Sequence, residues 1–253
     1  MNELNIVTGF ISVKSILDSK SRTIHRIILD KSRYDKIISS KYHKAEKIQY
    51  SILKNSGSKI EYVSQAEFSN YTESAVSGGI LAIVGERKYQ TIDDEIDNLE
   101  NKYYTILDGI EDPYNFGYAV RSLYAAGVDV LIIPDREYYH SVETIVRASA
   151  GAYERIKCCI THDLYGTCNK LKNRGVSLIA TAKNHASKDL NSVDIHAPVC
   201  LIYGGERRGI SKEILGICDK VIKIEYLRDC DYSLPAVSAI SILSFEIGNK
   251  LKK

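Results

Sequence analysis

The first segment with residues suited to chemistry runs over residues 107–117 and ends a predicted strand in a loop containing Gly109 and Pro113. A helix is expected to begin near Asn115, with Asn115 as its N-cap. Arg121 follows six residues later, close to two helical turns, so we expect both side chains near one helix face. A capped helix with a surface arginine also fits this pattern.

The second segment, residues 200–211, predicts a strand, a Gly-rich turn and a helix capped by Ser211. Glycines allow a ligand to approach the backbone closely. The spacing matches neither the dinucleotide-binding nor the Walker pattern. Glu206 in the turn also opposes a phosphate, whereas a ligand with net positive charge would tolerate its carboxylate better.

The third segment begins with residues 222–226, where a strand ends, and continues with a polar loop and a helix after Pro235 that begins with small residues. Small residues allow a helix to pack closely against another backbone. All three segments therefore combine the end of a strand with a loop and a helix.

The elements around these loops form a repeated strand–helix pattern, which predicts an α/β fold with a largely parallel sheet covered on both faces. Ligands bind such sheets beyond the carboxyl ends of the strands. The predicted strands are residues 104–107, 128–133, 177–181, 199–203 and 221–224. The loops expected to carry the chemistry follow Leu107, Ala180, Tyr203 and Ile224.

A smaller α/β domain is predicted over residues 1–100, followed by the larger domain over residues 101–253. Its expected elements are helices at 10–17 and 36–55, strands at 24–29, 60–63 and 80–84, and a charged linker at about 86–102. Residues 1–60 hold 12 Lys or Arg against 5 Asp or Glu, whereas residues 61–100 hold 2 against 9. The basic segment suits a phosphate backbone, although an ordinary solvated helix face explains the charge equally well.

The composition is that of a globular protein, with 44% hydrophobic and 26% charged residues among 253. No apolar run approaches the ~18 residues of a membrane helix, and the first residues lack a secretory signal, so we expect a cytoplasmic protein without membrane contact. The six cysteines form no C-x-x-C pair. We therefore expect no metal site and interpret the cysteines as reduced and mostly buried.

Together the three segments resemble the signature motifs of the SpoU class, the TrmH-like branch of the SPOUT RNA methyltransferases. The matching features are an Asn with an Arg six residues on, a Gly-x-Glu-x-x-Gly loop, and a strand followed by Ser-Leu-Asn-Val. Residues 147–152 and 178–182 agree with intermediate stretches, and the match covers residues 103–251. Residues 9–13 and 77–82 resemble a ribosomal-protein-like RNA substrate-binding domain.

The resemblance implies a trefoil knot, a homodimer, S-adenosylmethionine as cofactor, and 2′-O-ribose methylation of RNA, with ribosomal RNA preferred over transfer RNA. The catalytic residues it implies are Asn115, Arg121, Glu206 and Ser233. The cofactor-binding residues it implies are Thr181, Ala182, Tyr203, Gly204, Gly205, Gly209, Ile224, Tyr226 and Leu234.

The clearest departure from the class is Pro235, which stands where the third motif has Asn and supplies neither a backbone N–H nor a polar side chain. Gly205 and Arg207 are milder departures. An RNA-binding protein of the same fold without catalysis, such as a ribosome-assembly factor, is therefore an alternative, and an unrelated nucleotide-binding α/β enzyme is another. The sequence leaves open which RNA and which nucleotide is modified, and whether the acceptor is ribose or base.

Overall fold

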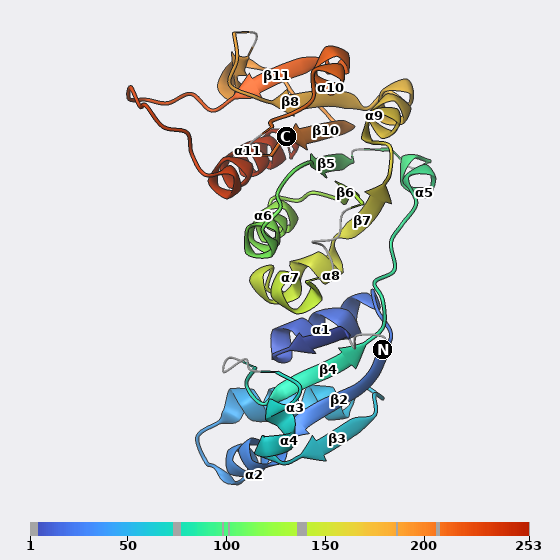
Figure 1. Ribbon diagram of the computed structural model, residues 1–253, viewed down its shortest axis with the longest axis vertical. Helices are drawn as coiled ribbons and strands as arrows, with labels where there is room; N and C mark the ends of the chain where they lie inside the picture. Colours follow the sequence, from blue (N-terminus) through green and yellow to red (C-terminus); the bar gives the residue numbers. More distant parts are fainter. Residues whose placement is uncertain are drawn as a thin grey trace. The chain divides into compact units, whose positions relative to one another are not determined.

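The computed structural model describes residues 5–72, 77–97, 99–100, 102–135, 141–185, 187–205 and 208–252. Contacts between residues divide the chain into two compact units (Figure 1). Unit 1 comprises Met1–Lys88 and His140–Arg155, and unit 2 comprises Tyr89–Tyr139 and Ile156–Lys253. The chain therefore passes between the units three times, whereas the sequence suggested one boundary near residue 100.

Unit 1 is built on a four-stranded sheet with the order β1-β4-β2-β3, in which β4 is antiparallel to β1 and β2 while β2 and β3 are parallel. The strands are β1 (Asn5–Thr8), β2 (Ile24–Asp30), β3 (Ile60–Val63) and β4 (Ile80–Val84). The helices are α1 (Phe10–Ser19), α2 (Lys31–Ser39), α3 (Lys44–Lys54), α4 (Gln65–Ser69), α7 (Val142–Ala148) and α8 (Ala152–Arg155).

The single helix predicted over residues 36–55 is wrong, because α2 and α3 are separate helices. Asp30 explains the early start of α2, since its carboxylate accepts the backbone N–H groups of Ser32 and Arg33. The helix predicted at 10–17 and the three strands predicted in this region are confirmed, whereas β1 was not predicted.

Residues 140–155 join unit 1 through buried polar contacts from α7 and α8. Glu154, whose side chain is fully buried, accepts hydrogen bonds from Arg22 Nε at 2.9 Å and from Ser21 Oγ at 2.5 Å. Thr8 Oγ1 donates to Glu143 Oε1 at 2.8 Å. These partners lie more than 130 residues apart in the sequence, which is why local patterns did not reveal the association.

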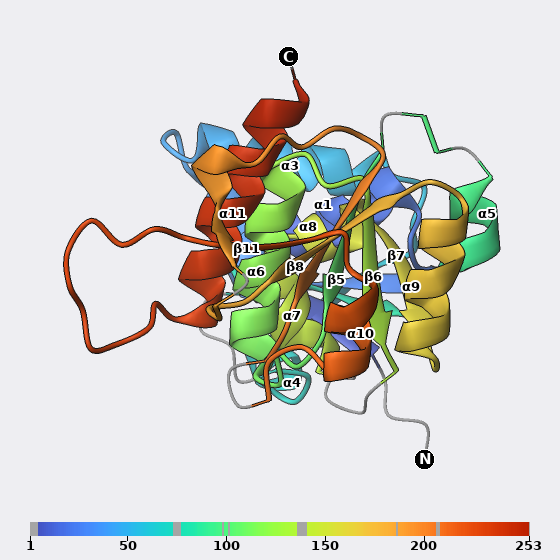
Figure 2. The ribbon, with the colours of Figure 1, turned by 90° about the horizontal axis from the view of Figure 1, so that it is seen from above.

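Unit 2 contains a seven-stranded sheet in which every described pairing is parallel, with the order β7-β6-β5-β10-β8-β11-β9. Its strands are β5 (Tyr103–Leu107), β6 (Val130–Pro134), β7 (Lys157–Thr161), β8 (Ser177–Thr181), β9 (Lys188–Asp189), β10 (Val199–Tyr203) and β11 (Lys220–Lys223). Its α-helices are α5 (Ile92–Ile96), α6 (Pro113–Ala125), α9 (Leu164–Asn173), α10 (Lys212–Ile217) and α11 (Ala236–Leu251). Figure 2 shows α6 and α11 on one face of the sheet and α9 and α10 on the other.

The five strands predicted for this region are confirmed within a residue or two, and β7 and β9 are additional. β11 lies between β8 and β9, although β8 and β9 follow each other in the chain. β11, which follows β10 in the chain, is thus inserted between two strands that precede β10. This order is compatible with a trefoil knot, which stays a prediction.

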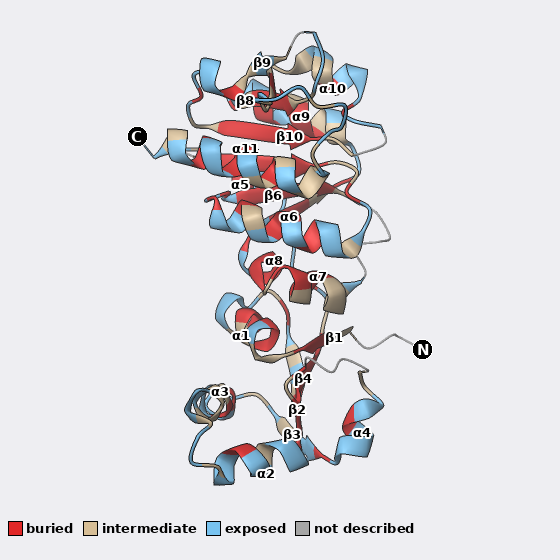
Figure 3. Ribbon diagram, turned by 90° about the vertical axis from the view of Figure 1, so that its left-hand side faces the viewer, coloured by how far each residue is buried: buried red, intermediate tan, exposed pale blue. Residues whose placement is uncertain are grey.

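The two helices on one face of this sheet pack closely through small residues. Ser241 Oγ of α11 donates to Ser122 Oγ of α6 at 2.7 Å. A Cβ added to Gly248 would lie 2.2 Å from the carbonyl oxygen of Ala126, so only glycine permits this approach. Both helices have buried residues toward the core and exposed residues on the opposite side (Figure 3).

The described cysteines form no disulfide, and Cys158, Cys159, Cys168 and Cys200 are buried in unit 2. Burial raises the pKa of Cys168 to about 12, so this thiol stays protonated and acts as a small apolar core residue. In the part of the chain that the structure describes, no cluster of three or more His, Cys, Asp or Glu side chains has the arrangement of a metal site. No helix among the same residues is both long and apolar enough for a membrane span.

Candidate functional site

The candidate site lies where the loops after four neighbouring strands meet. β5, β10, β8 and β11 are adjacent in the sheet and parallel, so their carboxyl ends share one edge. Backbone hydrogen bonds join these ends, since Asp108 N donates to Tyr203 O at 2.9 Å and Ala182 N donates to Ile222 O at 3.0 Å. The edge predicted from the strand pattern is thus formed by the segments singled out in the sequence.

Glycines bring the loop after β5 and the loop after β10 into direct backbone contact. A Cβ on Gly109, whose φ is +102°, would lie 2.8 Å from the Cα of Gly205, and a Cβ on Gly205 would lie 2.7 Å from Gly109 O. The second loop also closes on itself, because Gly209 N donates to Gly205 O at 2.9 Å. A Cβ on Gly204 would be 2.3 Å from the carbonyl carbon of Gly209. Side chains at these positions are therefore excluded by backbone rather than by flexible groups.

These two loops line a cavity of about 630 Å³. Its wall carries the carboxylates of Asp108, Glu111 and Asp112, the amide of Asn115 and the guanidinium of Arg208. Three carboxylates in one wall favour a ligand that carries positive charge. The cavity size falls within the range of about 300–1,000 Å³ that is common for small-molecule sites.

Asn115 is not the N-cap of α6, contrary to the sequence prediction. Asp112 occupies that position and accepts the backbone N–H of Asn115 at 2.8 Å, and Pro113 occupies the first helical position. Proline suits that position because its fixed φ is helical and the missing N–H would have no partner there. The side chain of Asn115 is consequently not required for capping and lines the cavity.

Arg121 is exposed on α6 and does not line this cavity. Six residues rotate an α-helix by about 600°, which leaves Arg121 roughly 120° around the axis from Asn115. The prediction that Asn115 and Arg121 lie on one face of α6 is therefore wrong. Among the described residues Arg121 makes no hydrogen bond or ion pair, and it shares its exposed face with Tyr114 and Tyr118.

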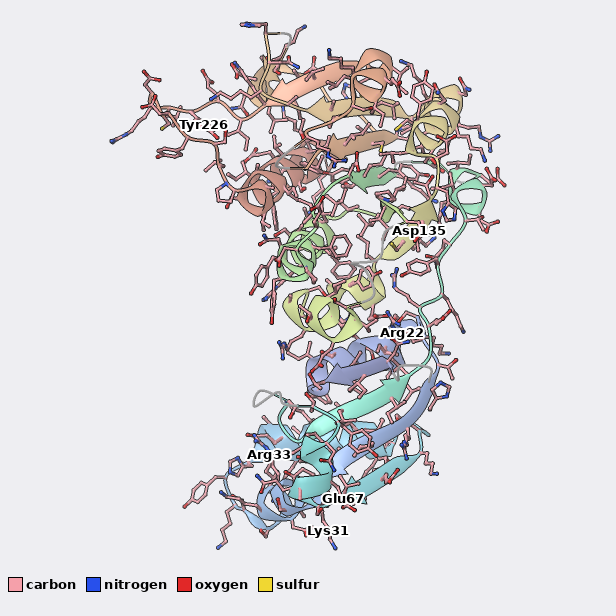
Figure 4. The ribbon with its side chains drawn as sticks, in the orientation of Figure 1. Arg22, Lys31, Arg33, Glu67, Asp135 and Tyr226 are labelled. Carbon is pink, nitrogen blue, oxygen red and sulfur yellow. The ribbon has the colours of Figure 1, made fainter. Side chains whose placement is uncertain are left out.

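The third segment forms a second cavity of about 410 Å³, lined by Lys183, Asp189 and residues 223–230. Tyr226 connects its parts, because its hydroxyl accepts the backbone N–H of Leu234 at 2.8 Å and Lys183 Nζ lies 5.1 Å from its ring centroid. Figure 4 shows Tyr226 on the long loop between β11 and α11, which projects from the rest of unit 2. Tyr226 thus links two parts of its own loop and places its ring beside Lys183 of the loop after β8.

The other predicted residues differ in what they present to this edge. Thr181 Oγ1 donates to Ile202 O at 3.1 Å, which joins β8 to β10. Tyr203 is buried with its hydroxyl 2.8 Å from Ser244 Oγ, and burial raises the pKa of this phenol well above its usual value. Only the backbone of Tyr203 therefore faces the site edge. Ile224 is half-buried, Ser233 is exposed, and Glu206 and Arg207 lie outside the described residues.

Four charged residues that line the two cavities were not predicted from the sequence: Asp108, Asp112, Lys183 and Arg208. Each stands within a few residues of the carboxyl end of a strand or within the Gly-rich loop. Their position relative to the strands was therefore a usable signal. Their side-chain directions depended on loop geometry that the sequence pattern does not specify.

Residues 102–245 of the chain match the SpoU rRNA Methylase family, and residues 6–90 match a family described as RNA 2′-O ribose methyltransferase substrate binding. A relative from Staphylococcus epidermidis, assigned to the TrmH family of tRNA/rRNA methyltransferases, is 31% identical over 206 residues, which span 79% of this chain and 82% of the relative. The relative YacO of Bacillus subtilis, assigned to the same family, is 30% identical over 79% of this chain and 80% of its own length.

Solved structures share the fold at lower identity. The SpoU methyltransferase AviRb from Streptomyces viridochromogenes, in complex with AdoMet, has a TM-score of 0.79 at 19% identity and covers 98% of this chain and 90% of its own. An AdoMet-bound rRNA methyltransferase from Sinorhizobium meliloti has a TM-score of 0.76 at 22% identity, with 97% and 87% covered. Both similarities extend over the two units described above.

Proposed function

The chain belongs to the SpoU rRNA methylase family, and on this premise we propose that it transfers a methyl group from S-adenosylmethionine to a ribose 2′-hydroxyl of RNA. The observation that carries the proposal is the meeting of the three motif loops at four neighbouring strand ends. The basic segment at residues 1–60 supports RNA as the substrate. We favour ribosomal over transfer RNA.

The residues at this edge fit such a cofactor. A Cβ would collide with backbone at Gly204 and Gly205, and Gly209 has a φ of +61°, so glycine at these positions lets main-chain groups approach and recognise an adenine. The acidic wall of the larger cavity suits the positive sulfonium and amino groups of the cofactor. The residues that would hold it are those implied by the resemblance: Thr181, Ala182, Tyr203 through its backbone, Gly204, Gly205, Gly209, Ile224, Tyr226 and Leu234.

When bound, the cofactor supplies a methyl group that is already activated on a sulfonium. The chain must then align the acceptor and manage one proton. Arg121 stays charged, because a neutral guanidine is too costly to serve as a base. We assign Arg121 to the phosphate beside the target ribose, where its charge lowers the pKa of the hydroxyl. Asn115, Glu206 and Ser233 are proposed to orient the acceptor by hydrogen bonds.

Methyl incorporation into RNA tests the proposal directly, with purified full-length chain, labelled cofactor and total cellular RNA, followed by nuclease mapping of the labelled ribose. Pro235 is the N-cap of α11, and its carbonyl accepts the N–H of Ala239 at 3.1 Å. We therefore expect Pro235→Asn to keep the fold and to alter activity by less than about tenfold, or ~1.4 kcal/mol in the barrier. An inactive wild type with an active Pro235→Asn would instead support an RNA-binding protein without catalysis.

Gly204→Ala is expected to weaken cofactor binding at least about tenfold, because the added Cβ meets Gly209 and Ile210 backbone and forces the loop to move. Titration calorimetry with S-adenosylmethionine on the full-length chain measures the effect. Gly216→Ala is the matched control, since a Cβ there meets nothing within 4 Å. Equal affinities for the two variants would show that this loop does not hold the cofactor.

A homodimer is proposed through the exposed faces of α6 and α11. Arg121 lies outside the cavity of its own chain, so a second copy is needed to bring it to a site. Ser241, a small residue of α11, is hydrogen-bonded to Ser122 of α6 within the chain. Ile242 and Phe245, 41% and 44% exposed, lie on one stripe of α11 and provide an apolar surface for a partner.

We expect Ile242→Asp with Phe245→Asp to convert the dimer to a monomer, because two carboxylates would have to be desolvated in the interface. Sedimentation velocity at micromolar concentration measures the state. Ile48→Asp, at a 61% exposed apolar position of α3 in unit 1, is the control. A wild-type monomer under these conditions would contradict the proposed dimer.

A further inference from the structure

Unit 1 contains a cavity of about 350 Å³ that the proposed methyl transfer does not use. The turn between β1 and α1 forms one wall, α2 and α3 form another, and α7 closes a third. Every lining residue belongs to unit 1. The cavity is therefore a property of this unit alone.

One end of the cavity is positively charged. The N-cap of the ten-residue helix α1 is Gly9, which has a φ of +83° and no side chain to cap the helix. No described residue accepts from the backbone N–H groups of residues 10–12. Arg33 and Arg147 also line the cavity, from α2 and α7 respectively. A helix N-terminus with two guanidinium groups is a site for an anion such as phosphate.

Arg33 is held in place by its stem and leaves its guanidinium available. A Cβ added to Gly79 would lie 2.8 Å from Arg33 Cδ. The aliphatic part of the Arg33 side chain therefore packs against the residue that precedes β4. The guanidinium is exposed and forms no hydrogen bond or ion pair with the described part of the chain. Figure 4 labels Arg33 together with Lys31 on the same helix. Lys31 does not line the cavity.

Tyr50 provides an independent sign of a ligand. It lines the cavity and is only 2% exposed, yet its hydroxyl has no hydrogen-bond partner among the described residues. The ring of Tyr34 packs edge-on at 5.0 Å and fixes its orientation. The charges that act on the hydroxyl come from Arg33, Asp30 and Glu46, of which Arg33 and Glu46 line the cavity. A buried unpaired hydroxyl is unfavourable, and a polar ligand atom in the cavity would satisfy it.

The rest of the lining suits a nucleobase. Glu46 and Gln49 stand one turn apart on α3 and offer an acceptor carboxylate and an amide. Phe10, Ile37 and Ile80 supply apolar surface for a flat ring. A cationic end, apolar walls and a hydrogen-bonding edge are together the complement of a nucleoside monophosphate.

We propose that this cavity binds one unpaired nucleotide, with its phosphate at the N-terminus of α1 between Arg33 and Arg147 and its base against α3. If the nucleotide belongs to the RNA substrate, the inference rests on the proposed function and assigns unit 1 a specific reading site. A free nucleoside monophosphate presents the same chemistry. The two sources differ in whether the rest of the RNA strand contributes to binding.

The test measures binding of AMP, GMP, CMP, UMP and a single-stranded RNA of mixed sequence to the full-length chain by calorimetry. We expect Arg33→Ala to weaken binding at least about tenfold and Tyr50→Phe about three- to tenfold, the effect of losing one hydrogen bond. Lys31→Ala, which removes a charge from the same helix outside the cavity, should leave nucleotide affinity unchanged. Tyr50→Phe should not lower the unfolding midpoint, because no hydrogen bond within the described chain is lost.

Binding of monophosphates that Arg33→Ala and Tyr50→Phe weaken supports a site for free nucleotides. Effects seen only with the RNA strand support a nucleotide of the substrate. Unchanged affinities for both kinds of ligand in both variants would overturn the inference. S-adenosylmethionine affinity and methyl transfer are measured on the same samples. If the chain transfers no methyl group but binds nucleotides in a way that depends on Arg33, the proposed reaction is refuted and the nucleotide site is still supported.

Discussion

Arg121→Ala is expected to lower the rate of methyl transfer by roughly 10²–10³-fold while leaving S-adenosylmethionine affinity nearly unchanged. The reason lies in the position of Arg121. It is exposed on α6, has no partner among the described residues, and does not line the cavity formed by the glycine loops. Its charge is thus available to an RNA phosphate, and it is not one of the residues that line the cavity proposed for the cofactor.

Arg121→Lys keeps the charge but should still lose at least about tenfold, since a single ammonium does not reproduce the two parallel hydrogen bonds of a guanidinium to a phosphate. Single-turnover rates with saturating cofactor separate the chemical step from binding, and calorimetry reports cofactor affinity. Arg174→Ala is a suitable control, because Arg174 is an exposed arginine of unit 2 that pairs with Asp97 at the surface. Equal losses in rate and in cofactor affinity would place Arg121 in the cofactor site instead.

Glu154→Gln is expected to destabilise the protein by about 3–5 kcal/mol, the usual cost of leaving a buried charge without its partner. Arg22 and Arg87 are each almost fully buried, and both direct their guanidinium groups at this carboxylate, at 2.9 and 3.8 Å. Arg87 also lies over the ring of Tyr153 at 4.4 Å. Removing the negative charge would leave two buried cations facing a neutral amide.

Urea unfolding of the full-length chain measures this loss, and Glu61→Gln is the control. Arg26 and Glu61 form an ion pair in the same unit with the same 2.9 Å distance, but both side chains are about one third exposed. We expect less than ~1 kcal/mol from this control, because water screens an exposed pair. The difference between the two losses in unfolding free energy measures the effect of burying the ion pair. Equal losses for the two substitutions would refute the structural role assigned to Glu154.

Much of unit 2 was predictable because its central strands are continuous apolar runs that are buried on both faces, as in β5 and β10, where every residue is buried. β7 escaped prediction because it begins with an exposed lysine and lies at the edge of the sheet. In unit 1, α2 and α3 were joined in the prediction because the polar residues between them carry no proline or glycine. The cap at Asp30 that separates this region from β2 became clear only from its hydrogen bonds.

The candidate site shows the same limit. The glycine loops were identifiable, because short apolar strands followed by Gly-rich turns locate the carboxyl edge of a sheet. The relation between Asn115 and Arg121 was wrong, because both residues lie within α6 and a spacing of six residues leaves them roughly 120° apart around the helix axis. The contacts of Tyr226, with Leu234 of its own loop and with Lys183 of the loop after β8, depend on how these two loops fold. Such contacts leave no periodic signal in a single sequence.

Unit 1 is formed by two separate stretches of the chain, residues 1–88 and 140–155. This arrangement affects the order in which the two units fold during translation. Unit 1 lacks the partners of Thr8 and Arg22 until Glu143 and Glu154 have been synthesised. At roughly 5–20 residues per second, the first 88 residues wait several seconds on the ribosome before α7 and α8 emerge. The amino-terminal unit is therefore completed only after β5 and β6 of the other unit have left the exit tunnel, so the two units mature in an interleaved order.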